Sequence, residues 1–318
     1  MVVLSFRAID FTFRRECLRR RKTSKPGENL EQRTTLSQLA LDTCDLAFNL
    51  RGNGWCWAKG LHVPDDTRPI ASTSAFALYV FLSAVIHFVV FDCLHYSVQS
   101  FSPKTFGSPI GGSIFDQSLV PTHRYFRSTF ISTLSGLTVY CSIHTLYDIA
   151  TLIGVVVLRQ TPSQWPPIFN SPWASTSLSE FWSKRWHQMF RSCFIALGAK
   201  PITFLVGPIG GVLAAFLISG ILHDWGLWAM GKGTDCWGVC GFFLMMGIGV
   251  VMEGIYNKVS GKRVGGWVGR LWTMCWALGW ANLIVDAWCR RGLVGSVFMA
   301  SPFRPSTTII RLMSRVLA

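Results

Sequence analysis

The feature that most constrains this chain is the grouping of its apolar residues into blocks long enough to cross a lipid bilayer. A transmembrane helix needs about 20 mostly apolar residues. Four or five stretches qualify, and they lie at residues 73–94, 128–158, 202–222, 236–256 and 267–288. The second is long for one span and short for two, so we expect a tilted or broken helix there. The sequence therefore predicts an all-α, multi-span transmembrane helix bundle with interfacial amphipathic helices.

Composition supports a membrane domain and suggests its boundaries. Half of the 318 residues are apolar and only 14% are charged, against roughly 25% charged in soluble domains. Residues 35–50 show a helical apolar pattern with polar breaks, which suits a helix lying on a membrane surface. We expect a basic disordered leader at 1–34, an interfacial segment at 35–72 and a membrane domain at 73–318, with its core at about 160–256.

The chain carries a net charge of +14, from 30 basic and 16 acidic residues. Such an excess can serve nucleic acid, anionic lipid or an anionic ligand. No basic groove interleaved with aromatic residues follows, so we expect no nucleic-acid partner. The basic residues of the first 34 positions favour a cytoplasmic tail facing lipid, with a merely disordered leader as the alternative. The first thirty residues lack the apolar stretch of a signal peptide.

Loop charges predict an orientation with one conflict. Basic residues in the loop 159–200, and in the loop after the fourth apolar block, place both loops in the cytosol. Five spans would then put the C-terminal tail in the lumen, although it carries Arg290, Arg291, Arg304, Arg311 and Arg315. Either one span is miscounted or the tail is an exception to the positive-inside rule.

Cysteine and histidine spacing predict neither a disulfide framework nor a metal site. None of the ten cysteines forms a C-x-x-C pair, and the dense histidine clusters of membrane hydroxylases are missing. Other polar groups in the apolar blocks are expected to make hydrogen bonds within a helix bundle. These are His87, Asp92, His95, His144, Asp148, Glu253, Asn282, Asp286 and Arg290.

The segment 177–191 carries the first candidate chemistry. Ser177 followed by Glu180 is a capping box, which predicts a helix start. One predicted face holds Phe181, Trp182, Arg185, Trp186, Met189 and Phe190, and the other holds Glu180, Lys184, His187 and Arg191. Glu180 and Lys184 form a favourable i, i+4 pair. An interfacial helix explains the aromatic face, but not a histidine beside cations, whose charges favour a neutral imidazole.

His223 at the end of the third apolar block is the second candidate. An ionisable residue at the edge of a span indicates function by default. Small residues precede it at four-residue steps, at Gly207, Gly211, Ala215 and Ser219. Close helix packing of the small-x-x-x-small kind is the favoured explanation of that ridge. Packing does not explain the imidazole.

Several motifs together resemble a known family. They are W-P-P-I-F-N from Trp165, S-L-S-E-F-W-S-K-R-W-H-Q from Ser177 and S-G-I-L-H-D ending at Asp224. The run resembles the wax-synthase-like branch of the membrane-bound O-acyltransferase family. Residues 51–57, R-G-N-G-W-C-W, resemble the R-G-x-G-W segment of its fungal members. Many of those acetylate terpenoid or meroterpenoid alcohols. The resemblance covers roughly residues 40–290, and relatives usually carry two or three spans before R-G-x-G-W, where this chain has its basic leader.

The resemblance implies an enzyme of the endoplasmic-reticulum membrane that uses acyl-CoA from the cytosol and holds no permanent cofactor. The family's catalytic histidine matches His223, and its second polar active-site residue matches His187. We expect His223 to act as general base on an alcohol and His187 to hydrogen-bond the thioester. No nucleophile elbow is present, so no acyl-enzyme is required. Substrate or CoA contacts are expected from Trp182, Lys184, Arg185, Trp186, Arg191 and Ser219. The three cations among them are explained equally well as the positive-inside signal of a cytosolic loop.

Three functions follow as hypotheses. The first is transfer of an acetyl group from acetyl-CoA to a hydroxyl of a lipophilic terpenoid-type secondary metabolite. The second is a long-chain wax ester or sterol ester synthase, because sequence does not size the acyl pocket. The third is a transporter or non-catalytic scaffold, which predicts internal inverted repeats that the sequence does not show. The expected partners are the bilayer, acyl-CoA and the alcohol, and the oligomeric state is not predicted.

Overall fold

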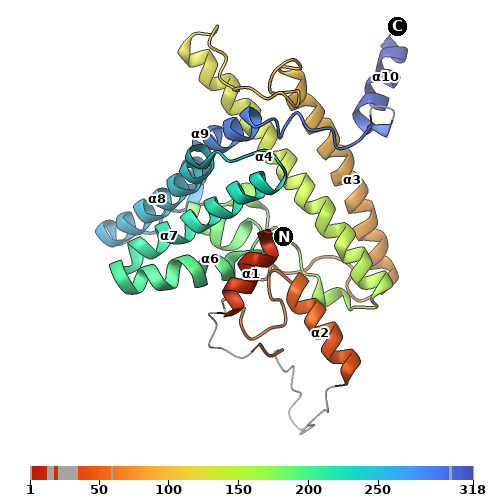
Figure 1. Ribbon diagram of the computed structural model, residues 1–318, viewed down its shortest axis with the longest axis vertical. Coiled ribbons are helices and arrows are strands. Elements are labelled where there is room, and N and C mark those ends of the chain that lie inside the picture. The colour runs from red at the N-terminus through yellow and green to blue at the C-terminus, as the bar shows by residue number, and fades with distance from the viewer. Residues whose placement is uncertain (1, 13–17, 21–34, 59, 301–302, 318) are drawn as a thin grey trace.

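Long helices make up most of the computed structural model, which describes residues 2–12, 18–20, 35–58, 60–300 and 303–317 (Figure 1). The long helices are α3 (Thr73–Ser100), α4 (Pro121–Leu152), α7 (Lys200–Ala229), α8 (Cys236–Ser260) and α9 (Gly266–Arg290). The described residues contain no strand, only an isolated bridge between Arg20 and Trp55. The predicted all-α class is confirmed.

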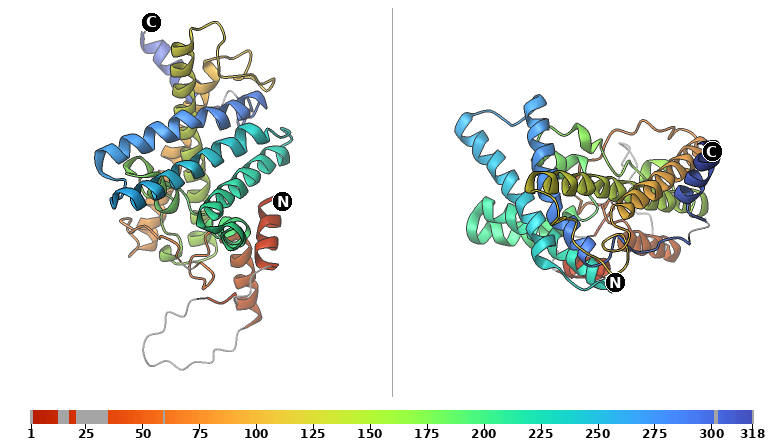
Figure 2. Two further views of the ribbon diagram at one scale, coloured as in Figure 1. Left: turned by 90° about the vertical axis from the view of Figure 1, so that its left-hand side faces the viewer. Right: turned by 90° about the horizontal axis from the view of Figure 1, so that it is seen from above.

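Four helical segments are long and apolar enough to cross a membrane. They are Thr73–Ser100, Pro121–Val157, Arg191–Ala229 and Cys236–Ser260, and they coincide with the first four predicted blocks. The helices α3 and α4 run antiparallel along the length of the molecule, and α7, α8 and α9 stack side by side across them (Figures 1 and 2). The chain is therefore an integral membrane protein, as predicted.

The fifth predicted block forms helix α9, but α9 is not among the helices that meet the hydropathy requirement for a span. Its sequence contains five tryptophans as well as Arg270, Asp286 and Arg290. Tryptophan favours the membrane interface over the hydrocarbon interior. The helix instead joins two others, because it packs against both α4 and α8.

Two of the long helices are broken. The prediction of a broken second span holds near its end, where α4 continues into the π-helical turn η1 (Ile153–Val157). That span begins earlier than predicted, at Pro121, where proline loses no intrahelical hydrogen bond. Helix α7 is interrupted at Gly207, whose φ of 85° and ψ of 179° precede Pro208. The positive φ there favours glycine, so the break separates the first turns of α7 from the part that carries His223.

The front of the chain departs in part from the predicted disordered leader. Residues Val2–Thr12 form helix α1, and Leu36–Phe48 form α2. The ring of Phe6 packs edge-on against Trp225 of α7 at 5.5 Å, and Arg7 donates hydrogen bonds to carbonyls at the end of α2, including Leu50 O at 3.4 Å. Burial of Phe6 explains why the leader is helical there. Residues 13–17 and 21–34 of the predicted leader lie outside the described part.

Polar groups within the bundle join helices, as expected. Asn282 of α9 accepts from Ser132 of α4 at 2.8 Å and donates to Thr129 at 3.0 Å. The last helix, α10 (Pro305–Leu317), is fastened to α3 by Asp92, which accepts from Arg304 Nε and from Ser306 N, both at 2.8 Å. The Asp92 and Arg304 side chains are 7% and 14% exposed.

Substitution Arg304→Gln is expected to destabilise the protein by about 3 kcal/mol, because it leaves the buried Asp92 carboxylate without its cation. The matched control is Arg290→Gln. Arg290 pairs with an equally buried aspartate, Asp286, at 2.6 Å, but the Arg290 side chain is 58% exposed, whereas that of Arg304 is 14% exposed. Because water screens the exposed arginine, the control should cost less than the Arg304 variant. Thermal unfolding in detergent measures both, and equal effects would contradict the assigned difference in burial.

Candidate active site

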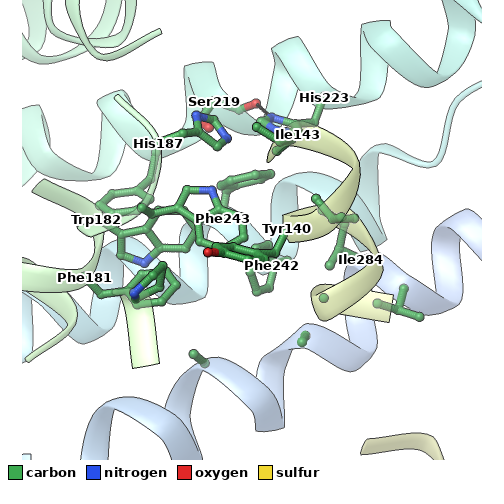
Figure 3. Close-up of a pocket in the computed structure, with 18 of the residues that line it drawn as sticks. Tyr140, Ile143, Phe181, Trp182, His187, Ser219, His223, Phe242, Phe243 and Ile284 are labelled. Atoms are coloured by element: carbon green, nitrogen blue, oxygen red, sulfur yellow. Dashed lines mark hydrogen bonds between the residues drawn. The ribbon is translucent and has the colours of Figure 1, made fainter. Parts of the chain in front are cut away.

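A single large cavity brings the two predicted histidines together. It has a volume of about 1120 Å³ and is bounded by α4, α7, α8, α9 and the segment 172–199. Its walls are mostly apolar, and both His187 and His223 line it. Figure 3 shows the two imidazoles on the same side of the cavity, with Ser219 between them.

Helix α7 fixes the tautomer of His223. Its Nδ1 lies 2.7 Å from the carbonyl oxygen of Ser219, one turn earlier. A carbonyl only accepts hydrogen bonds, so Nδ1 carries the proton and Nε2 keeps its lone pair. The ring packs against Phe243 of α8, with the ring centroids 4.5 Å apart. His223 thus presents an unprotonated ring nitrogen as a candidate base.

The small residues before His223 border the cavity as well as packing against neighbouring backbone. Gly211, Ala215 and Ser219 all line the cavity, and His223 follows them at the same four-residue interval. Close packing on α8 is made by Gly220 instead, because a side chain there would strike Cys240. The predicted close packing of this ridge holds in part, because a side chain at Gly211 would strike Thr203 and the Ala199 carbonyl, and one at Gly198 would strike the backbone of Ala214 and Ala215. The sequence does not distinguish the two uses, since both need a row of small residues.

The predicted capping box forms at the start of the short helix α5 (Leu178–Glu180). Ser177 Oγ accepts from Glu180 N at 3.0 Å, while the Glu180 carboxylate reaches back to Thr176, whose N lies 2.8 Å away. Burial alone would raise the pKa of Glu180, but hydrogen bonds from Thr176 and Arg185 lower it below its ordinary value. The predicted pair between Glu180 and Lys184 is replaced by one with Arg185, at 2.7 Å.

The predicted continuous helix through residue 191 is wrong. Helix α5 continues as a π-helical turn, η4 (Phe181–Arg185), and the backbone becomes extended at Trp186. Gln188 stabilises this exit, because its Nε2 donates to the carbonyls of Trp182 and Trp186, both at 2.9 Å. Helix α6 (Arg191–Phe194) and the π turn η5 (Ile195–Ala199) follow and lead into α7.

The aromatic residues of this segment pack into the protein rather than toward lipid. The Trp182 ring lies 5.9 Å from Phe216 of α7 and 6.2 Å from Phe243 of α8. Trp186 packs edge-on against Phe169 at 5.0 Å. These inward contacts exclude the alternative explanation, an interfacial helix with its aromatic side chains toward lipid. They also explain why the helix opens, since a regular helix would not place both Trp186 and His187 at the cavity.

His187 is neutral, as predicted, but for a different reason. Burial, then His223, then Arg51 lower its pKa to about 3. The charges of Lys184 and Arg191, which were expected to keep the imidazole neutral, are not among the causes that lower this pKa. Among the described residues, His187 Nδ1 is buried and has no hydrogen-bond partner.

The remaining predicted contacts divide into two groups. Trp182, Trp186, Arg191 and Ser219 line the cavity together with the histidines. Lys184 and Arg185 do not. Arg185 is instead engaged by Glu180 and by the carbonyl of Asn170, which lies 3.1 Å from Nη1.

Arg51 of the R-G-x-G-W motif is a supporting residue that the sequence reasoning did not single out. It is 6% exposed, and its Nη1 donates to the carbonyls of Pro166 and Pro167, both at 3.0 Å. The Tyr147 hydroxyl also donates to the Pro166 carbonyl, at 2.7 Å. This fixes the segment that leads to Phe169, whose ring lies 6.0 Å from His187. The R-G-x-G-W motif marked Arg51, but its partner was not predictable, because 115 residues separate Arg51 from Pro166.

One group of side chains in the described part of the chain has the composition of a metal site. His87, His144 and Asp148 place their ligand atoms within 4.8 Å of one another. The two imidazoles are stacked at 4.0 Å and nearly parallel, and His87 Nδ1 lies 2.9 Å from the carbonyl of Ser83, to which it donates. Parallel rings direct their lone pairs side by side rather than at one ion. The arrangement suits a hydrogen-bonded cluster between α3 and α4.

Relatives of the chain include acyltransferases from fungi and plants. The chain is 24% identical to acetyltransferase ple2 of Rhodocybe pseudopiperita, over 78% of this chain and 66% of that protein. It is 29% identical to acetyltransferase spyB of Aspergillus fumigatus, over 45% and 28% of the two chains. It is 30% identical to a long-chain-alcohol O-fatty-acyltransferase of Simmondsia chinensis, over 30% of each. The chain thus spans 66% or less of the length of these relatives.

A family model described as the membrane bound O-acyl transferase family matches residues 165–245. That interval contains the W-P-P-I-F-N run, the segment with His187 and the part of α7 with His223. The resemblance inferred from the motifs is confirmed for this segment, because residues 165–245 match the membrane-bound O-acyltransferase family.

Proposed function

We propose that this protein transfers an acyl group, and specifically an acetyl group from acetyl-CoA, to a hydroxyl of a lipophilic terpenoid-type alcohol. The observation that carries the proposal is the meeting of His187 and His223 at one large, mostly apolar cavity. They come from different elements, 36 residues apart, within the segment that matches the acyltransferase family.

In the proposed reaction, His223 Nε2 accepts the proton of the acceptor hydroxyl. The oxygen attacks the thioester carbonyl carbon, a C–O bond forms and the C–S bond breaks. The departing thiolate takes the proton back from the imidazolium, so the enzyme returns to its starting state. His187, held neutral, donates a hydrogen bond to the carbonyl oxygen as negative charge develops on it.

The size and lining of the cavity support a bulky apolar acceptor. Its volume of about 1120 Å³ lies at the upper end of ligand pockets, which span roughly 300–1,000 Å³. An acetyl group fills little of that space, which leaves room for a polycyclic alcohol. The fungal acetyltransferases among the relatives favour this donor. The same cavity also suits a long-chain donor, in keeping with the Simmondsia relative.

Arg191 is the proposed contact for the phosphates of CoA. It is half-buried and lines the cavity, and no ion pair joins it to any described residue. Cations without a carboxylate partner bind phosphate oxygens strongly in partly buried sites. The cytosolic orientation proposed from loop charges would place this end of the cavity where acyl-CoA is available. The family resemblance implies the endoplasmic-reticulum membrane, and we assign the protein to it on that ground.

Replacing His223 by Ala should lower acyl transfer by about 100-fold to 10,000-fold, because the general base is lost. His187→Ala should lower kcat by about 100-fold through loss of one hydrogen bond to the developing oxyanion. CoA release in microsomes at equal expression measures both. The control is His123→Ala, an exposed histidine outside the cavity lining. Full activity of His223→Ala would end the proposed mechanism.

Acetyl-CoA and palmitoyl-CoA offered to the same membranes, with terpenoid and long-chain alcohols, separate the two acyltransferase hypotheses. We expect ester formation with acetyl-CoA and the terpenoid alcohol. A preference for palmitoyl-CoA would replace acetyl transfer by wax or sterol ester synthesis. Release of no CoA with any pair would favour the transporter or scaffold.

Arg191→Gln should raise the KM for acyl-CoA by about tenfold, the equivalent of one charge-assisted hydrogen bond, while leaving kcat nearly unchanged. Lys184→Gln is the matched control, because Lys184 belongs to the same basic segment but is exposed outside the cavity. Initial rates over a series of donor concentrations measure both. An equal rise in KM for the two variants would contradict a specific contact between Arg191 and CoA and would indicate a general effect of positive surface charge.

The low pKa of His187, about 3, predicts an acid-sensitive fold. The unfolded chain binds a proton near the ordinary value of about 6.5 while the folded chain does not. Stability should therefore fall as the pH drops below about 6.5, continue to fall toward the folded pKa, and be unaffected by this group at higher pH. His187→Gln should lose less stability between about pH 7 and about pH 5 than the wild type. Equal losses in thermal unfolding would contradict the depressed pKa.

A further inference from the structure

The carboxyl group of Glu253 lies at the start of the segment that leads to His187. Glu253 is near the end of α8 and is 7% exposed. Its Oε1 accepts from Leu178 N at 2.7 Å and from Trp272 Nε1 at 2.9 Å, and its Oε2 accepts from Ser179 N at 2.9 Å. One side chain therefore joins α8, α9 and the first turn of α5.

The two backbone N–H groups that donate to Glu253 lie at the start of a helix, where the helix offers them no carbonyl partner of its own. The first N–H groups of a helix have no partner within it. Ser177 satisfies the N–H of Glu180, and Glu253 satisfies those of Leu178 and Ser179. All three residues of α5 thus have their N–H groups fixed, two of them by a side chain 74 or 75 residues away.

Two glycines allow the backbone at 176–179 to approach α8 and α9. A side chain at Gly249, one turn before Glu253, would overlap Leu178 and Trp276. A side chain at Gly269 of α9 would overlap the carbonyl of Thr176. Leu178 itself is 0% exposed. The start of α5 is therefore held in a fitted recess, with the Glu253 carboxyl as its polar contact.

Only seven residues separate Ser179 from His187, and few of them are free to absorb a displacement. Trp182 is packed against α7 and α8, and Gln188 ties the carbonyls of Trp182 and Trp186 together. A shift at the start of α5 would consequently be transmitted along the turn η4 to the imidazole of His187. Glu253 does not line the cavity, so it acts on the site through the chain.

We propose that Glu253 is a positioning residue of the active site, whose carboxyl group sets the position of His187 by fixing the first turn of α5. This inference rests on the proposed acyl transfer, because its effect is measured as turnover. It predicts that substitution of Glu253 lowers kcat and leaves substrate binding unchanged.

The test compares Glu253→Gln with a matched carboxyl group elsewhere in the bundle. Asp286 of α9 is 5% exposed and also holds a loop, since it accepts from Ile114 N at 2.9 Å and Ser113 Oγ at 2.8 Å. A displacement of the order of 1 Å can cost about 100-fold in rate, so we expect Glu253→Gln to lower kcat by about 10-fold to 100-fold. The KM for acyl-CoA should stay within about twofold. Asp286→Asn should lower kcat far less at comparable thermal stability.

A double-mutant cycle separates positioning from general destabilisation. If Glu253 acts through His187, Glu253→Gln should cause little further loss in a His187→Ala background. Additive losses, or a Glu253→Gln variant with wild-type kcat, would overturn the inference. If Glu253→Gln is not recovered as folded protein, the cycle is run with Glu253→Asp. That variant keeps both acceptor oxygens but withdraws them by one methylene, and it should lose kcat without a matching rise in KM.

Failure of this inference is distinguishable from failure of the proposed function. Unchanged activity of His187→Ala and His223→Ala would contradict the proposed acyl-transfer site itself. Strong losses in those two variants, with additive behaviour of Glu253→Gln, would leave the site in place and remove only the role of Glu253.

Discussion

The structure depends on satisfying the backbone hydrogen bonds of an irregular segment that packs against the long helices. Where that segment is buried, each unpaired N–H or C=O is costly, so its non-helical backbone needs protein partners. Between residues 159 and 199 those partners arrive from distant elements. Arg51 and Tyr147 hold the Pro166 carbonyl, Glu253 holds the start of α5, and Gln188 closes its end. The placement of His187 is the outcome of these contacts.

The two imidazoles are supported in opposite ways. His223 sits on the long helix α7, whose Ser219 carbonyl fixes its tautomer, and its ring packs against Phe243 of α8. His187 has no regular element beneath it and is held by contacts on both sides of an opened turn. The proposed base, His223, is thus fixed by a regular helix, whereas His187 on the opposite wall is fixed by contacts from several elements. The substrate would bind between the two imidazoles.

Sequence predicted what local periodicity and capping determine. The four spans, the capping box at Ser177 and the pairing of His187 with His223 all have short-range signals or a motif. The opened helix after Arg185 had none, because the inward packing of Trp182 and Trp186 depends on α7, α8 and Phe169. The cause of the neutral His187 was likewise misassigned, since burial is a tertiary property and Lys184 is near only in sequence.

The row of small residues on α7 has a geometric consequence. Gly211, Ala215 and Ser219 border the cavity at four-residue steps, which an α-helix spaces about 6 Å apart along its axis. Each position therefore lies at a different distance along the cavity from the imidazole of His223. A larger side chain at Ala215 or Ser219 would shorten the space open to a bound molecule, whereas Gly211 has no room for one because it would strike Thr203.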